Sequence, residues 1–215
     1  MFNTIFPKIH KEGYKFLAIS ILATFIVLFF SKFIGSLLIL VTVWVYYFFR
    51  DPERYSINND NYLVSPADGL ITDISERSGP EELRLENTSF KRISVFMNVF
   101  NCHVNRVPAS GKIEEIFYKP GKFLNASLDK ASEENERNYY KIKLNNGEDI
   151  IIVQIAGLIA RRIVCETEQG QELKQGERIG MIRFGSRVDV YFKNKKVLAK
   201  LGQNVVAGES LLASE

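Results

Sequence analysis

Cysteine and histidine are scarce in this sequence, with two residues of each among 215. So few cysteines cannot build the disulfide framework of a small secreted domain, and we expect Cys102 and Cys165 to be free thiols in a reducing cytosol. Zinc sites in proteins usually take about three or four ligands, chiefly Cys and His. The sequence therefore predicts no metal site.

Several other functional classes lack their characteristic features here. The net charge is only +3 and both signs are mixed along the chain, so there is no basic stripe of the kind that nucleic acids bind. No Met-Lys-Met or Asp-Lys-Ala hairpin is present to carry biotin or a lipoyl group, and no lysine motif indicates pyridoxal phosphate. We expect neither a nucleic-acid partner nor one of these cofactors.

Apolar residues, by contrast, are concentrated near the N-terminus. Residues 16–30 and 33–49 are almost wholly apolar and are separated by Ser31 and Lys32. Each run is short for a membrane span, which needs about 20 residues, and no signal-peptide cleavage pattern follows. The stretch fits a helical hairpin with Ser31, Lys32 and Gly35 near its turn, one long tilted helix that buries Lys32 at a cost, or a partly embedded segment. A buried core hairpin of a soluble protein is the remaining interpretation.

Positive residues flank both ends of the apolar stretch: Lys8, Lys11 and Lys15 precede it, and Arg50 and Arg54 follow it. Lysine and arginine beside membrane segments favour the cytoplasmic side. Both ends are therefore expected in the cytoplasm, which favours the hairpin or the embedded segment. We predict a membrane-associated segment at residues 1–54 and a catalytic domain at residues 55–215.

The rest of the sequence has the pattern of a mainly β domain. Strand-like runs cover residues 64–71 (broken by a turn), 93–100, 111–118, 139–144, 149–155 and 187–192. An Asn-Gly pair between two of these runs predicts a β-hairpin. Glycine-spaced turns in residues 170–180 and 202–209 are typical of barrel-sandwich domains. We therefore predict a mainly β, barrel-sandwich-like catalytic domain with an N-terminal hydrophobic helical membrane segment.

A Gly-Ser pair lies between two strand-like runs at Gly185 and Ser186. If Gly185 is held in a strained turn, the Ser186 hydroxyl is placed to attack the carbonyl that precedes it. Arg183 and Arg187 supply fixed positive charge suited to an anionic substrate. The plainer interpretation is a hairpin turn with two solvated arginines.

Two further positions combine a reactive side chain with turn signals. Asp68 lies between Pro66 and Gly69, which is the pattern of an Asx-type turn. His103 is the only histidine outside the N-terminal tail and directly follows a strand-like run. A lone histidine is more often structural than catalytic, but functional groups are commonly presented on loops after strands.

Five elements, in this order, resemble the phosphatidylserine decarboxylase family. They are Phe-Arg-Asp-Pro-x-Arg at 49–54, Ser-Pro-Ala-Asp-Gly at 65–69, the segment around His103, the run 154–163, and Phe-Gly-Ser at 184–186. The resemblance covers essentially residues 45–212. Long members of the family usually carry Leu-Gly-Ser-Thr at the last site, and this chain matches the short bacterial and archaeal form.

The resemblance implies a self-cleaving decarboxylase. Ser186 would attack the Gly185 carbonyl, and cleavage would leave a covalent pyruvoyl group at residue 186 as the cofactor. Phosphatidylserine would form a Schiff base with that group and lose carbon dioxide to give phosphatidylethanolamine, with His103 as the candidate acid. The enzyme would be a heterodimer of chains 1–185 and 186–215 at the cell membrane, facing the cytoplasm, and a higher oligomer stays open.

One motif departs from the long members of the family. They carry two histidines three residues apart in this place, whereas this chain has His103 followed by Arg106. The Asp-His-Ser relay proposed for long members therefore matches at Asp68 and Ser186 but lacks its histidine. The base that activates Ser186 stays open, and Arg106 joins Arg183 and Arg187 as a candidate substrate-binding residue.

Two alternative functions accompany this interpretation. A non-catalytic, membrane-tethered barrel-sandwich adaptor would show no self-cleavage. A pyruvoyl decarboxylase of a different serine-containing lipid would cleave itself but prefer another substrate.

Overall fold

The computed structural model describes residues 6–124, 134–158, 162–183 and 185–215. The chain divides into two compact units. One comprises Met1–Glu53 and Val99–His103, and the other comprises Arg54–Asn98 and Val104–Glu215. The helical unit thus takes its second segment from the middle of the sequence, a grouping that a single boundary near residue 54 does not capture.

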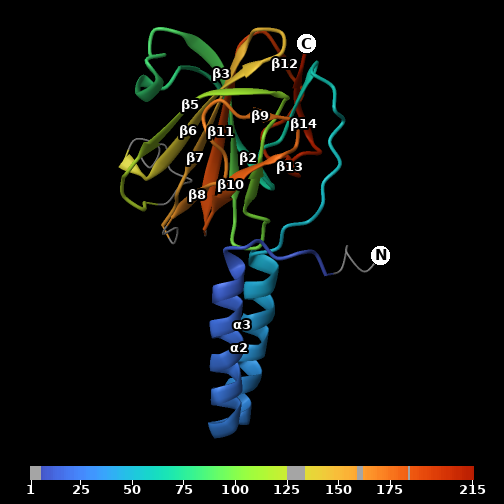
Figure 1. Ribbon diagram of the computed structural model, residues 1–215, viewed down its shortest axis with the longest axis vertical. Helices are drawn as coiled ribbons and strands as arrows, with labels where there is room; N and C mark the ends of the chain where they lie inside the picture. The colour runs from blue at the N-terminus through green and yellow to red at the C-terminus, as the bar shows by residue number, and fades with distance from the viewer. Residues whose placement is uncertain (1–5, 125–133, 159–161, 184) are drawn as a thin grey trace. The chain divides into compact units, whose positions relative to one another are not determined.

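Two helices, α2 (Gly13–Phe30) and α3 (Lys32–Phe48), form the first unit. Ser31 separates them, because its extended backbone (φ −148°) ends α2, and its hydroxyl then accepts a hydrogen bond from the Ile34 N–H at 3.4 Å. A serine in this position is a favoured helix N-cap. Of the arrangements considered for the apolar stretch, the structure shows the helical hairpin (Figure 1).

Small and hydroxylated residues join the two helices. The Thr42 hydroxyl lies 2.7 Å from the Ser20 hydroxyl and 2.9 Å from that of Thr24. Gly35 packs so tightly against Leu28 that a Cβ on Gly35 would lie 2.5 Å from the leucine side chain. Close approach at small residues with hydrogen bonds between helices is typical of packing in membranes.

The hairpin presents its large apolar side chains outward. Phe25, Phe29 and Phe33 are among the most exposed, at 74%, 85% and 76%. Helix α2, with 18 residues, is long and apolar enough to cross a membrane, and α3 is slightly shorter. At about 1.5 Å per residue, α2 spans about 27 Å, close to the roughly 30 Å of a bilayer core.

Strands form the second unit. Their bounds are β1 (Tyr62–Val64), β2 (Gly69–Ser78), β3 (Ser89–Met97), β4 (Val104–Arg106), β5 (Gly111–Lys119), β6 (Arg137–Leu144), β7 (Asp149–Ile155), β8 (Ile163–Cys165), β9 (Glu172–Leu173), β10 (Arg178–Ile182), β11 (Ser186–Phe192), β12 (Lys196–Val197), β13 (Asn204–Val205) and β14 (Leu211–Ser214). A short 3-10 helix, η1 (Glu81–Leu83), lies between β2 and β3.

An 8-stranded sheet in the order β13-β2-β3-β11-β7-β6-β5-β9 dominates this unit (Figure 1). Two 3-stranded sheets, β1-β14-β12 and β4-β10-β8, complete it. Apolar residues from all three sheets share the main core, for example Leu63 of β1, Ile179 of β10 and Val190 of β11. The mainly β prediction is therefore confirmed, as is the apolar helical N-terminus.

The 8-stranded sheet is buried on both faces at its centre. Val188 and Val190 of β11 face the main core, whereas Tyr191 faces a second cluster that includes Phe90 and Val153. Successive side chains of a strand point to opposite faces. The residues of β11 therefore divide between two environments, and this division places the candidate site residues.

The predicted hairpin around Asn-Gly is confirmed as β6 and β7, which pair in antiparallel register. The hairpin interpretation of the Gly-Ser pair is wrong. Strand β10 belongs to a 3-stranded sheet and β11 to the 8-stranded sheet, so the chain changes sheets between them. Gly185 and Ser186 thus lie at a junction between sheets.

Candidate active site

Ser186 begins the strand at the middle of the 8-stranded sheet. It pairs with Met97 of β3, and the next residue, Arg187, pairs with Phe96 on one side and Ile155 on the other. A strand paired on both sides has little freedom to move. Residue 186 is therefore fixed where the chain enters the sheet.

Gly185 precedes it with a positive φ of +20°. Residues with a Cβ rarely adopt a positive φ, so glycine suits this junction for conformational reasons. A Cβ on Gly185 would meet no atom of the described chain within 4 Å, so crowding is not the reason. The peptide between residues 185 and 186 thus combines an unusual backbone with a fixed strand.

The Ser186 side chain points into the main core. It shares a face of β11 with Val188 and Val190, and its residue is fully buried. Its hydroxyl has no hydrogen-bond partner among the residues that the structure describes. Buried hydroxyls are usually hydrogen-bonded, so an unpartnered one in a core is a candidate for reaction chemistry.

A chain of buried polar side chains crosses the same core. The Tyr140 hydroxyl donates to Gln154 Oε1 at 2.9 Å and lies 3.2 Å from the Ile179 carbonyl oxygen. Gln154 Nε2 donates to Asn105 Oδ1 at 2.8 Å, and Asn105 Nδ2 donates to Met97 Sδ at 3.5 Å. The network ends at Met97, the cross-strand partner of Ser186.

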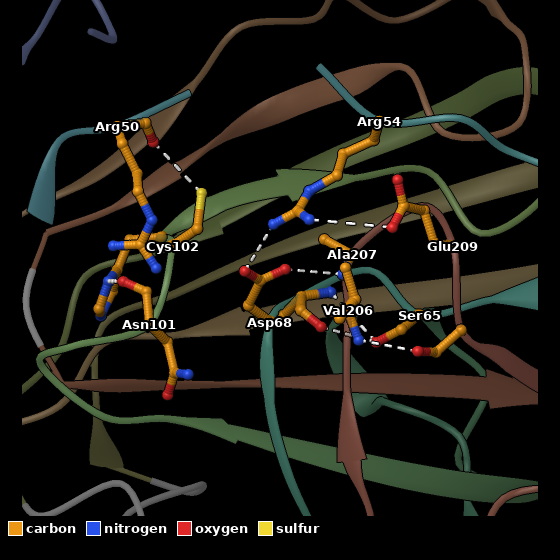
Figure 2. Close-up of polar contacts among 12 residues, drawn as sticks. Arg50, Arg54, Ser65, Asp68, Asn101, Cys102, Val206, Ala207 and Glu209 are labelled. Carbon is orange, nitrogen blue, oxygen red and sulfur yellow. Dashed lines mark hydrogen bonds and ion pairs between the residues drawn. The ribbon is translucent and has the colours of Figure 1, made fainter. Parts of the chain in front are cut away.

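Asp68 is held by a defined set of partners (Figure 2). Its Oδ2 accepts a hydrogen bond from Arg54 at 2.7 Å, and its Oδ1 accepts from the Ala207 N–H at 2.8 Å. Arg54 also lies 3.9 Å from a Glu209 oxygen. The next residue is Gly69. A Cβ at this position would lie 2.1 Å from the Phe96 carbonyl oxygen, so only glycine fits here without a clash.

The sheet brings Asp68 and Ser186 to the same end of β3. Leu70 and Arg187 both pair with Phe96, from opposite sides. Strands lie about 4.8 Å apart, so the backbones on either side of β3 are separated by about 10 Å. The Asp68 carboxylate is bonded to Arg54 and Ala207, and no described contact joins it to the Ser186 hydroxyl.

Arg187 points away from the hydroxyl of Ser186. Its guanidinium donates one hydrogen bond to Asp189, from Nη2 to Oδ2 at 3.0 Å, and forms an ion pair with it in which Nε lies 2.9 Å from Oδ1. Both residues are buried on the face of β11 opposite Ser186, and Arg92 lies 3.8 Å from the same carboxylate. Burial disfavours the charged form of Arg92, but the Asp189 carboxylate nevertheless raises its pKa. The arrangement is suited to fixing β11.

The other two arginines are tied to backbone groups. Arg106 is buried in β4 and donates to the Gly176 carbonyl at 2.8 Å. Arg183 is half-buried just after β10, and its backbone N–H donates to the Arg162 carbonyl at 3.2 Å. Their substrate-binding roles stay predictions.

His103 belongs to the helical unit. Its ring lies 4.3 Å from that of Phe48, between centroids, and its Nδ1 lies 3.0 Å from the Asn101 carbonyl oxygen. Because a carbonyl only accepts, Nδ1 carries the proton and Nε2 has a lone pair, with no partner in the described parts of the chain. Burial lowers the pKa of His103 to about 4, helped by the charge of Arg50 and opposed by the Asn101 hydrogen bond.

This pKa changes the chemistry open to His103. Nothing in the residues around position 103 predicts a shift of this pKa, and an imidazole with its ordinary pKa would suit an acid. At neutral pH the buried ring is instead uncharged, with Nε2 able to accept a proton. The resting protein therefore offers a base at this position, which becomes an acid only after it has taken a proton.

Asn105, Gln154 and Tyr140 were missed by the sequence analysis. Gln154 carried a signal, since it is the one polar residue in an otherwise apolar Ile-Ile-Ile-Val-Gln-Ile run of β7. Asn105 lies two residues after His103, and no sequence pattern marked it as a functional residue. No group of three or more His, Cys, Asp or Glu side chains that could hold a metal ion occurs within residues 6–124, 134–158, 162–183 and 185–215.

Comparison with known proteins gives consistent matches along the chain. The family model described as phosphatidylserine decarboxylase matches residues 41–213. A Pelagibacter ubique protein named phosphatidylserine decarboxylase proenzyme is 65% identical over 215 residues, covering 100% of both chains. Proteins of the same name from Rickettsia akari and Rickettsia typhi are each 49% identical over 99% of this chain and 92% of their own.

Proposed function

The chain belongs to the phosphatidylserine decarboxylase family, and from this we propose that it is a proenzyme that converts phosphatidylserine to phosphatidylethanolamine. The active form would carry a pyruvoyl group made from Ser186 by cleavage of the chain after Gly185. The observation that carries this proposal is the buried Ser186 hydroxyl, which has no hydrogen-bond partner within the described chain, beside a glycine of positive φ. A mobile hydroxyl and an unusual backbone conformation at the scissile peptide both suit a serine that attacks its own preceding carbonyl.

The proposed cleavage uses atoms of the chain and one water molecule. Ser186 Oγ bonds to the Gly185 carbonyl carbon as the bond from that carbon to the Ser186 nitrogen breaks, which converts the amide to an ester. Elimination then removes the Cα proton of residue 186 to a base and breaks the bond between Cβ and Oγ, so Oγ leaves with the new Gly185 carboxylate. A proton added to Cβ converts the resulting enamine to an imine. Water replaces the nitrogen of residue 186, ammonia is released, and a ketone remains.

The residues around position 186 fit a group of this size and polarity. Met97 and Val188 provide apolar walls, and the Asn105 amide offers a donor nearby. A pyruvoyl ketone supplies the electron sink that no coded side chain provides for removing carbon dioxide from an amino acid. The buried pair of Arg187 with Asp189 would hold β11 in place once Ser186 becomes a chain end.

We assign proton transfer to His103 and lipid access to the helical hairpin. The neutral Nε2 of His103 would accept a proton and return it, a role for which imidazole is well suited. The exposed apolar surface of α2 and α3 would hold the protein in the membrane that contains its substrate. The basic flanks of the hairpin favour a catalytic domain that faces the cytoplasm.

Intact-mass measurement of the purified protein tests the proposal. We expect chains 1–185 and 186–215, the smaller one lighter by one ammonia than a peptide that starts with serine. Ser186→Ala should remain a single chain. Ser94→Ala is the matched control, since Ser94 of the neighbouring strand β3 is also fully buried and its hydroxyl has no partner among the described residues. That variant should cleave normally.

The same preparation separates the alternative functions. An adaptor would stay a single chain and release no carbon dioxide from any lipid. A decarboxylase of another serine-containing lipid would show two chains but turn over phosphatidylserine more slowly than that lipid in a panel of headgroups. A single-chain wild-type protein that decarboxylates phosphatidylserine would disprove the pyruvoyl mechanism.

A further inference from the structure

The core near Ser186 contains a side-chain amide donor, that of Asn105, whose described hydrogen bond is weak. Asn105 is fully buried, and within the described chain its Nδ2 donates only to Met97 Sδ, at 3.5 Å. A thioether is a weak acceptor. Burying a polar donor without a good partner costs about 1–3 kcal/mol, so such a group in a native core calls for an explanation.

The position of this donor follows from the register of the sheet. Met97 is the cross-strand partner of Ser186 in β3, and Gln154 is that of Val188 in β7. Asn105 contacts both Met97 and Gln154, which lie on opposite sides of β11. Its side chain therefore crosses over β11 near Ser186. Cross-strand side chains are about 5 Å apart at Cβ, so the contact with Met97 brings Nδ2 to the face of β11 on which the Ser186 hydroxyl lies.

The network fixes the orientation of this amide. Gln154 Nε2 donates to Asn105 Oδ1, which leaves Asn105 Nδ2 on the far side, toward Met97. The reverse orientation would set Asn105 Oδ1 against the Met97 sulfur, two acceptors in contact. Burial also raises the pKa of Tyr140 well above its ordinary value, so its hydroxyl keeps the proton it donates.

On the premise of the self-cleavage proposed above, we infer that Asn105 Nδ2 donates a hydrogen bond to the Gly185 carbonyl oxygen while Ser186 Oγ adds to that carbonyl. As the new bond from Oγ to carbon forms, the carbonyl electron pair moves onto the oxygen, and Nδ2 stabilises the negative charge there. The hydroxyl proton passes to a base and then to the nitrogen of residue 186 as its bond to carbon breaks. Gln154 and Tyr140 are positioning residues, because they act through Asn105.

The rate of chain cleavage in freshly synthesised precursor tests this role. Removing one oxyanion donor typically slows a reaction by about 10²- to 10³-fold, so Asn105→Ala should cleave more slowly by that factor. Ser94→Ala is the matched control, because it removes a buried hydroxyl of β3 on the face opposite Met97 and should cleave within about twofold of wild type. Two chains on a denaturing gel, followed over time, give the rate without any assay of decarboxylation.

Asn105→Asp distinguishes a role of Asn105 as hydrogen-bond donor from a role in packing. It also tests the donor role if Asn105→Ala does not fold. This variant keeps an oxygen to accept from Gln154, but at neutral pH it places an anion where the donor was. Burial raises the pKa of a carboxyl, and the protonated form is again a donor. Its cleavage rate relative to wild type should therefore rise as the pH falls, whereas a packing role predicts a ratio that does not change with pH.

The two proposals fail in different ways. Wild-type precursor that never cleaves would overturn self-cleavage and this inference together. If wild type cleaves, then folded Asn105→Ala cleaving at the wild-type rate, or a constant ratio for Asn105→Asp across pH, would overturn the role of Asn105 alone.

Discussion

His103 should titrate far below the ordinary range of histidine, and this can be measured directly. Burial lowers its pKa from 6.5 to about 4. Between these values the unfolded chain binds a proton that the folded chain does not, so the folded protein gains stability as the pH rises. The contribution is fully present above about pH 6.5 and is lost as the pH falls toward 4. Linkage gives a loss of about 2 kcal/mol at pH 5 and about 3 kcal/mol at pH 4.

The sequence makes the measurement simple, because the chain has only two histidines. Full-length Ser186→Ala protein in detergent, labelled at histidine, should give two imidazole signals by NMR. Adding His10→Gln identifies the remaining signal as His103, which we expect to stay neutral down to a midpoint of about 4. A midpoint near 6.5 would refute the reasoning, since the ring would then be solvated.

Stability provides an independent check on the same group. His103→Phe removes the titration but keeps an aromatic ring against Phe48. Between pH 7 and pH 5, the free energy of unfolding should fall by about 2 kcal/mol less in this variant than in Ser186→Ala protein that keeps His103. Parallel pH curves for the two proteins would show that His103 does not carry this acid sensitivity.

Two further predictions concern the flank of the site and the membrane. In urea denaturation, Asp68→Asn should lower the free energy of unfolding by about 3 kcal/mol, because it leaves the largely buried Arg54 without its carboxylate. Lys122→Ala should lower it by at most about 1 kcal/mol, because the ion pair of Lys122 with Glu134 is exposed. Equal losses would contradict this ranking. The full-length protein should sediment with membranes, resist extraction by salt and dissolve in detergent. A protease added to intact cells should not cleave its β unit. Recovery of the protein from the soluble fraction would count against the anchoring role of the hairpin.

Local sequence pattern predicted much of the fold. The apolar runs 16–30 and 33–49, broken at Ser31, became two helices because a serine with extended backbone both ends one helix and caps the next. The Asn-Gly pair predicted the β6–β7 hairpin. Alternation in Arg187–Phe192 predicted a half-buried strand; the strand is present, but both of its faces are buried. These features depend on residues close together in the chain.

The site was harder to predict, because its geometry depends on long-range pairing. Sequence proximity suggested that Arg187 serves the same chemistry as Ser186, but strand alternation sends its side chain to the opposite face, where Asp189 binds it. No local sequence pattern indicated that β10 and β11 belong to different sheets. Asn105 and Gln154 meet only because β4 and β7 lie in sheets that share a core.

The place of β11 in the sheet order has a consequence for the mature protein. The segment after Gly185 supplies β11 between β3 and β7, β13 at the sheet edge beside β2, and β14 between β1 and β12. Cutting the chain at this junction would therefore sever a covalent bond without creating a separable subunit, because the small fragment is woven through the sheets of the large one. A fragment lost from the sheets would take the central strand with it, and with that strand the core residues Val188, Val190 and Phe192, so refolding of the large chain alone would not restore the site.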